Sequence, residues 1–238
     1  MLKVCHQYKV KIKKQKLAGG IVPVDSFDSF TIKQIEFTEA KTFILQYEWL
    51  KNIGSAKYCF GLYFGSHLAS VACYTSPVSP NGYKKILGEK NGIILQLCRG
   101  ASSYWAPKWA SSKIISSSLK MIQKQFGAIA VVAYADPKAG EIGTIYQACN
   151  AIYIGLTNSG GAKTYIINGT KYHPRKIHKL YGSRKPEILR KIDPHFKTIK
   201  IKPKHRYIFL LGTSWRKKEY LNKISHLIQP YPKRENYS

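Results

Sequence analysis

Two side chains suited to acid–base chemistry, Asp136 and Tyr146, lie ten residues apart near the middle of the chain. Asp136 follows the apolar run of residues 128–135 and precedes Pro137, so the backbone that carries this carboxylate is restrained. A carboxylate accepts a proton and a phenol donates one, so the two side chains could act together on one substrate group. A structural role for Asp136 also stays open, because an Asp before a turn commonly caps that turn.

The elements around these residues explain how both side chains could reach one place. Residues 128–135 are apolar and too few for a packed helix, which predicts a buried central strand. Residues 138–140 predict a turn, residues 144–149 a short amphipathic helix, and residues 151–156 the next strand. A strand that ends in a carboxylate and continues through a turn into a helix places both side chains at one edge of a sheet.

Short motifs in this stretch resemble known proteins. The run IYQACNA at residues 145–151 resembles the LYexxGF helix of the GNAT acyltransferase superfamily. The motifs YADP at 134–137, GTIYQA at 143–148 and IYIG at 152–155 together resemble the phage Mom family of DNA-modification proteins, and a thinner likeness extends from about Thr31 to Pro232. The resemblance implies an α/β (α+β) fold, with a GNAT-like mixed, mostly antiparallel central sheet flanked by helices.

The same resemblance implies a function. Mom proteins add a carbamoylmethyl group to the exocyclic N6 amine of adenine, which protects phage DNA from restriction nucleases. By this resemblance the chain is a DNA adenine-modifying transferase, and its target base is extruded from the duplex. Two other classes stay open: an N-acyltransferase that acts on a protein or a small amine, and a non-catalytic DNA-binding relative.

Catalytic roles follow in part from the residues themselves and in part from the resemblance. Asp136, with Tyr134 beside it, is the expected acceptor for the N6 amine, and Tyr146 stands where many GNAT enzymes place a general acid. Glu48 occupies the position of a family His between two aromatic residues, and its carboxylate could be a base, a metal ligand or a solvated helix residue. Arg99 matches a family Arg after a strand, where it could anchor an anion or form a salt bridge at the rim.

The coenzyme A fingerprint of GNAT enzymes is absent. Those enzymes cradle a pyrophosphate in a Gly-rich loop, whereas this chain has WAPKWA at residues 105–110. Ser111 and Ser112, together with the free N–H groups at the start of the following helix, are the candidate cofactor-binding groups that remain. The cofactor is therefore unknown, and the donor of the transferred group cannot be read from these residues.

The net charge of +27, from 39 Lys and Arg against 12 acidic residues, is the strongest signal in the composition. Such a chain is attracted to polyphosphates by counterion release. The 4 Trp and 17 Tyr that accompany the charge also suit a nucleic acid. We expect double-stranded DNA as the partner, with Trp49, Tyr104, Trp105 and Trp109 either stacked on an extruded base or packed in the core.

The basic residues concentrate in the second part of the chain. Residues 158–238 hold 20 Lys and Arg with 4 acids, whereas residues 1–157 hold 19 with 8. We predict a GNAT-like catalytic core with a basic N-terminal segment at residues 1–157, and a basic C-terminal extension at residues 158–238 that packs on the core and contacts DNA. The expected contacts are His173, Arg175, Lys176, Lys204 and Arg206, each of which could instead be an ordinary surface charge.

The remaining pattern predicts the other elements. For residues 1–20 we predict a strand or a basic arm, and for residues 75–82 a loop. We predict a helix over residues 39–51, with Thr38 as its N-cap. Further strands are predicted over 30–35, 58–64, 67–74, 93–98, 163–167, 196–201 and 205–211, and helices over 111–125 and 214–227.

The composition also excludes several classes of protein. No apolar run approaches 18 residues, so we expect no transmembrane helix and no membrane partner. The 5 Cys are scattered without a C-x-x-C pair, which suggests neither a zinc site nor a disulfide framework. We therefore assign no metal site and expect a reducing, cytoplasmic location.

Overall fold

The structure, a computed structural model, describes residues 4–157, 163–172 and 174–233. The chain forms two compact units. Unit 1 contains Met1–Gly155 together with His205–Ser238, and unit 2 contains Leu156–Lys204. Each unit has a hydrophobic core of its own.

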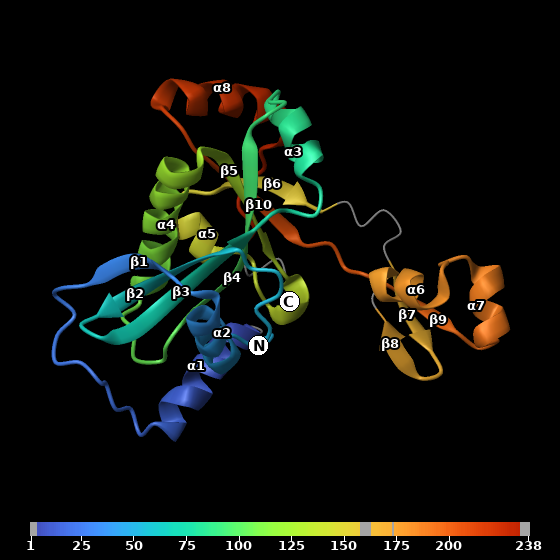
Figure 1. Cartoon of the computed structure of the whole chain (residues 1–238), viewed down its shortest axis with the longest axis horizontal. Coiled ribbons are helices and arrows are strands. Elements are labelled where there is room, and N and C mark those ends of the chain that lie inside the picture. The colour runs from blue at the N-terminus through green and yellow to red at the C-terminus, as the bar shows by residue number, and fades with distance from the viewer. Residues whose placement is uncertain (1–3, 158–162, 173, 234–238) are drawn as a thin grey trace. The chain divides into compact units, whose positions relative to one another are not determined.

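Unit 1 is built on a seven-stranded sheet with the order β1-β2-β3-β4-β5-β10-β6 (Figure 1). The pairs β1–β2, β2–β3, β3–β4 and β5–β10 are antiparallel, and β4–β5 is parallel. This is the mixed, mostly antiparallel sheet that the sequence predicts. The strands are β1 (Thr31–Ile35), β2 (Tyr58–Phe64), β3 (His67–Thr75), β4 (Ile93–Ser102), β5 (Ala128–Ala135), β6 (Ile152–Leu156) and β10 (His205–Leu210).

Helices cover both faces of this sheet, because alternate residues of its central strands point to opposite sides. On β5, Val131 and Ala133 face α4 (Ala110–Phe126) and α5 (Thr144–Ala148), while Ala130 and Val132 belong to the core on the other side. That other face is covered by α2 (Phe37–Tyr47), α3 (Pro80–Leu87) and α8 (Ser214–Ile224), which is followed by a short 3-10 turn, η2 (Ser225–Leu227). The sheet is therefore buried on both faces.

Unit 2 is a three-stranded antiparallel sheet with two helices. Its strand order is β8-β7-β9, and its buried side chains are Ile167, Ile177 and Leu189. The elements are β7 (Lys163–Ile167), β8 (Thr170–Tyr172), α6 (Pro174–Tyr181), α7 (Pro186–Ile192) and β9 (Lys197–Lys200). The sequence predicts one boundary, after residue 157, whereas the two units divide after Gly155 and again after Lys204, because His205 begins a strand that pairs with β5.

The elements of unit 1 differ from the predicted ones at several places. Residues predicted as a strand or an arm form the helix α1 (His6–Leu17), which is held by the side chain of Gln7. The amide of Gln7 donates to Tyr47 O (2.8 Å) and accepts from Trp49 N–H (3.2 Å). α2 is preceded by Glu36 rather than capped by Thr38, and the predicted loop 75–82 ends where Pro80 begins α3, as suits Pro in a first helical turn.

No helix in the described part of the chain combines the length and the apolar character that a membrane crossing requires.

Candidate active site

The candidate site lies where β4 and β5 separate. The two strands pair from Ile93–Ala128 to Leu97–Ala133, after which β4 continues beside β3 and β5 continues beside β10. The register between β3 and β4 shifts at this point, since Tyr74 pairs with Leu97 but Cys73 pairs with Arg99. Cys98 is therefore an extra, bulged residue, of the kind that often redirects side chains next to a functional site.

A cavity of about 190 Å³ opens at this separation on the face of the sheet covered by α4 and α5. Its walls come from β3, β4, α4 and α5, and Tyr146 lines it. The hydroxyls of Ser102 and Ser111 lie 2.5 Å apart within it. Ser111, a predicted cofactor-binding residue, is thus in the cavity, and Gln7 of α1 lines it as well.

Glu48 enters the site from the end of α2. The backbone leaves the helix here (φ −97°, ψ 142°), which turns the side chain inward and leaves the residue only 6% exposed. Its Oε2 accepts a hydrogen bond from Leu50 N–H (2.8 Å). Burial raises the pKa of Glu48, the positive charge of Arg99 opposes that rise, and the negative charge of Glu141 adds to it. Glu48 is therefore a buried carboxyl rather than a solvated helix residue.

Glu141 is a second carboxylate at this place, and it is not among the site residues predicted from the sequence. Its Oε1 accepts a hydrogen bond from the indole Nε1–H of Trp49 (3.0 Å), and its Oε2 accepts from Asp136 N–H (3.4 Å). Glu141 thereby joins the end of α2 to the end of β5. The sequence does contain a signal for Glu141, since it is a second acidic residue five positions after Asp136, on the turn that follows the predicted strand.

Tyr146 lies within the electrostatic reach of both carboxylates. Burial raises the pKa of its phenol most, the charge of Glu141 adds to the rise, and Glu48 contributes in the same direction. The phenol therefore stays protonated at neutral pH and can donate a proton or a hydrogen bond. The ring packs against Tyr207 and Phe209 of β10, which restricts where the hydroxyl can point.

Asp136 is tied into the turn that carries Glu141. Its Oδ1 accepts from Lys138 N–H (2.9 Å), which caps the 3-10 turn η1 (Pro137–Ala139). Its carbonyl oxygen also accepts from Glu141 N–H (3.1 Å). Asp136 thus shapes the turn that presents Glu141, and the catalytic role expected for its carboxylate stays a proposal.

Arg99 lies on the α2 side of β4. Its guanidinium donates to the carbonyl oxygens of Asn52 and Cys98, the latter at 2.6 Å. The same charge acts on the carboxyl of Glu48. Arg99 is therefore held by backbone groups within electrostatic reach of Glu48 rather than in a salt bridge at the rim.

Other predicted site residues lie away from this group. Tyr134 points to the opposite face of the sheet, where its hydroxyl is 2.5 Å from that of Tyr83. The hydroxyl of Ser112 donates to Trp109 O (2.9 Å) and does not line the 190 Å³ cavity. Alternation along β5 explains the position of Tyr134, because its neighbours Ala133 and Ala135 occupy the face that meets α4.

The predicted stacking aromatics divide into two groups. Trp49 belongs to the site through its hydrogen bond to Glu141. Trp105 and Trp109 instead pack against Phe64 at the far end of the sheet, and Trp109 remains 40% exposed. The hydroxyl of Tyr104 donates to Ile21 O (2.9 Å). Only Trp49 is thus placed beside the carboxylates.

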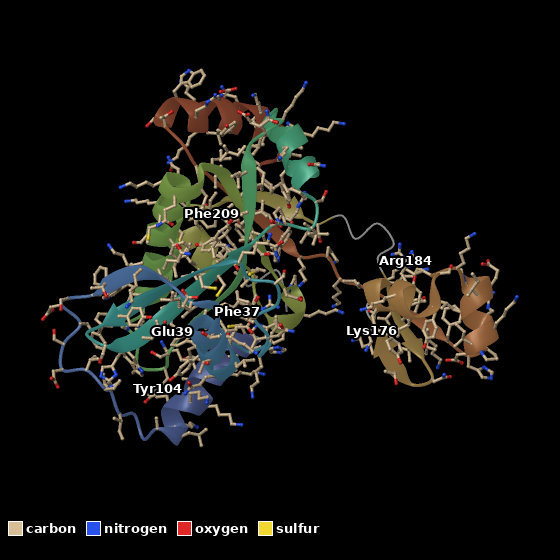
Figure 2. The ribbon with its side chains drawn as sticks, in the orientation of Figure 1. Phe37, Glu39, Tyr104, Lys176, Arg184 and Phe209 are labelled. Carbon is tan, nitrogen blue, oxygen red and sulfur yellow. The ribbon has the colours of Figure 1, made fainter. Side chains whose placement is uncertain are left out.

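The predicted DNA contacts lie in both units. In unit 2 the ammonium of Lys176 sits over the ring of Tyr172 (5.3 Å), and Figure 2 labels Lys176 and Arg184 there. In unit 1 Arg206 donates to Ile154 O (2.9 Å). Lys204 N–H donates to Thr157 Oγ1 (2.8 Å) at the end of unit 2. His173 and the side chain of Arg175 lie outside the described part of the chain.

Within the described residues, no group of three or more His, Cys, Asp or Glu side chains is arranged to hold a metal ion. The site offers a phenol, Tyr146, which lines the small cavity, two carboxylates that act electrostatically on that phenol, and a guanidinium that acts on Glu48. This set can take a proton from a nucleophile, stabilise positive charge on it and donate to a leaving group.

Comparison with known proteins identifies a family and several relatives. The sequence profile of the Mom protein family matches residues 29–233. The methylcarbamoylase mom of Escherichia phage Mu is 27% identical over 175 residues, which cover 73% of this chain and 70% of the phage protein. The solved structure of an IAA acetyltransferase from Bacillus cereus has a TM-score of 0.42 and 12% identity, and covers 77% of this chain and 100% of its own. That of Arabidopsis thaliana NAA60 in complex with acetyl-CoA has a TM-score of 0.45 and 7% identity, and covers 77% and 99%.

Proposed function

The chain belongs to the Mom protein family, and we propose that it is a transferase that modifies the exocyclic N6 amine of adenine in double-stranded DNA. The transferred group is proposed to be the carbamoylmethyl group of this family, and the outcome to be protection of phage DNA from restriction. The observation that carries the proposal is the meeting of Glu48, Glu141 and Tyr146 beside the cavity where β4 and β5 separate.

The chemistry of an adenine amine explains why such a group is needed. The N6 lone pair is delocalised into the ring, so the amine attacks only if its developing positive charge is stabilised and a proton is removed. Glu48 is our candidate for the proton acceptor, because its raised pKa makes its carboxylate a stronger base than an exposed one. Asp136, at the end of the neighbouring strand, is retained as the second candidate acceptor.

The other groups complete the proposed reaction. A bond forms between N6 and an electrophilic carbon of the donor while the leaving group departs and one N6 proton passes to the carboxylate. Tyr146, held protonated, donates to the leaving group, and Arg99, beside Glu48, and Ser111, in the cavity, are retained as candidate contacts of an anionic donor. The cavity of about 190 Å³ is below the 300–1,000 Å³ typical of drug-sized ligands. Its size suits a small transferred group.

Unit 2 supplies much of the proposed attraction to DNA. Residues 156–204 hold 13 Lys and Arg and 2 acids, which gives them a net charge of +11 in 49 residues. A duplex must also release its target base before any side chain can reach N6. Trp49, fixed by its hydrogen bond to Glu141, is the aromatic side chain best placed to contact an extruded base.

The experiment measures modified adenine directly. Plasmid DNA from cells that express the protein is digested to nucleosides, and the mass of adenosine derivatives is determined. We expect a modified deoxyadenosine with wild-type protein and with Glu36→Gln, which changes an exposed carboxylate at the other end of α2. Glu48→Gln and Tyr146→Phe should reduce it. Unmodified DNA from cells with folded, wild-type protein would refute the proposed function.

A further inference from the structure

A second and larger cavity lies apart from the candidate active site. It measures about 620 Å³ and is formed by α4, the end of α5, β10 and α8. Its floor is apolar and includes Leu119, Phe209 and Leu211, all of them buried. Figure 2 labels Phe209, which belongs to β10. None of the residues that line this cavity lines the smaller one beside Tyr146.

The rim of this cavity is positively charged. Lys120 of α4 and Lys217 and Lys218 of α8 line it, and none of the described residues that line it is acidic. The amides of Gln123 and Asn150 add hydrogen-bonding groups. An apolar floor with cationic and amide groups at one side is the arrangement that favours an organic anion over a neutral molecule.

The geometry of α8 explains why these lysines keep their charge exposed. Residues three and four apart share a helix face, so Arg216, Glu219 and Lys223 form one stripe. Glu219 pairs there with Arg216 (3.1 Å) and Lys223 (2.7 Å), and Arg216 also reaches Glu89 (3.5 Å). Lys217 and Lys218 lie off that stripe. Among the described residues, neither they nor Lys120 has an ion-pair partner.

We propose that this cavity binds a small organic anion with an apolar body, whose charged head meets Lys120, Lys217 and Lys218. Its volume falls in the range of 300–1,000 Å³ typical of small-molecule sites. The head group gains charge-assisted hydrogen bonds from the ammonium groups, and the body removes apolar surface from water on Leu119, Phe209 and Leu211. The inference rests on the cavity alone and does not depend on the proposed function.

The test uses 8-anilinonaphthalene-1-sulfonate, a fluorescent probe with an apolar ring system and one sulfonate. We expect saturable binding of one probe per chain, weakened about tenfold by Lys120→Glu and by the double variant Lys217→Glu/Lys218→Glu. Lys124→Glu is the matched control, because Lys124 is one turn further along α4, exposed, and absent from the cavity wall. This control should bind the probe as wild type does. Equal loss in Lys124→Glu would overturn the proposal.

A neutral variant and competitors separate this site from a general attraction of anions. Leu221→Ser removes part of the apolar wall without changing charge, and it should also weaken the probe. Octanoate should displace the probe, whereas inorganic phosphate at the same ionic strength should not. Displacement by phosphate as readily as by octanoate, or by a short DNA duplex but not by octanoate, would refute a small-molecule site. The competition experiments use wild-type protein, so they test the proposed anion site even if a variant fails to fold.

Discussion

Replacement of Glu48 by Gln should make the protein more stable at neutral pH while it removes most of the activity. Burial raises the pKa of this carboxyl, so the folded protein binds a proton here more tightly than the unfolded chain does. The stability that comes from this proton is complete below the ordinary pKa of 4.5 and is lost as the pH rises through the higher folded pKa. Gln stays neutral throughout and avoids that loss.

The size of the effect follows from the contacts of Glu48. Each unit by which a pKa is raised costs about 1.4 kcal/mol in the ionised form. Gln keeps an oxygen that can accept the hydrogen bond from Leu50 N–H, and Arg99 keeps the two carbonyl oxygens to which it donates. We therefore expect Glu48→Gln to melt above wild type at pH 8 by about 2–4 °C for each kcal/mol recovered, and to match it near pH 4.

The assay is a series of melting curves between pH 4 and pH 8, with adenine modification measured in parallel. Loss of a placed acid–base group typically reduces the rate about 100- to 10,000-fold. Glu36→Gln should change neither property, because Glu36 is exposed. If Glu48→Gln melts at or below wild type at pH 8, or the difference does not grow with pH, then Arg99 stabilises the carboxylate more than burial costs, and the reasoning is refuted.

Three further outcomes are expected. Asp136→Asn should keep the fold, since Asn can still accept the hydrogen bond from Lys138 N–H, yet it should nearly abolish adenine modification, and Tyr146→Phe should lose less of it. A wild-type level of modification in Asp136→Asn would show that the Asp136 carboxylate has no part in the mechanism. Duplex affinity should fall steeply with salt. Lys176→Glu should make the slope of log K against log salt shallower by about 0.9 or more and Lys41→Glu on α2 should leave it unchanged, so a wild-type slope in Lys176→Glu would show that Lys176 does not contact phosphate. Calorimetry should detect no micromolar binding of acetyl-coenzyme A, because residues 105–110 offer no Gly-rich cradle, and tight binding would contradict this.

The fold of unit 1 could be predicted from local patterns because its strands are short apolar runs bounded by turn residues. Gly65-Ser66 marks the hairpin between β2 and β3, and the run at 128–135 is β5 with the predicted bounds. The first helix could not be predicted, because alternating Lys and apolar residues fit a strand and a basic arm equally well. What decides for a helix is the contact of Gln7 with the end of α2, forty residues away.

In the candidate site, too, the contacts between residues far apart in the sequence could not be predicted. Asp136 and Tyr146 are close in sequence, so their association through one turn could be predicted. Glu48 and Glu141 are 93 residues apart, and their pairing depends on how the ends of α2 and β5 meet. The face of Tyr134 could not be assigned either, because β5 is buried on both sides and its sequence is apolar at nearly every position.

Unit 2 lies in the chain between two strands of the sheet of unit 1. β6 ends at Leu156 and β10 begins at His205, and these two strands are neighbours in the sheet of unit 1. The ends of unit 2 are joined to each other, because Thr157 N–H donates to Lys204 O (2.7 Å) and Lys204 N–H donates to Thr157 Oγ1 (2.8 Å). Unit 2 therefore occupies the place of a connection between adjacent strands, a position at which insertions are well tolerated. A basic unit of 49 residues could be added or exchanged there without changing the register of β5 and β10, on which Tyr146 packs.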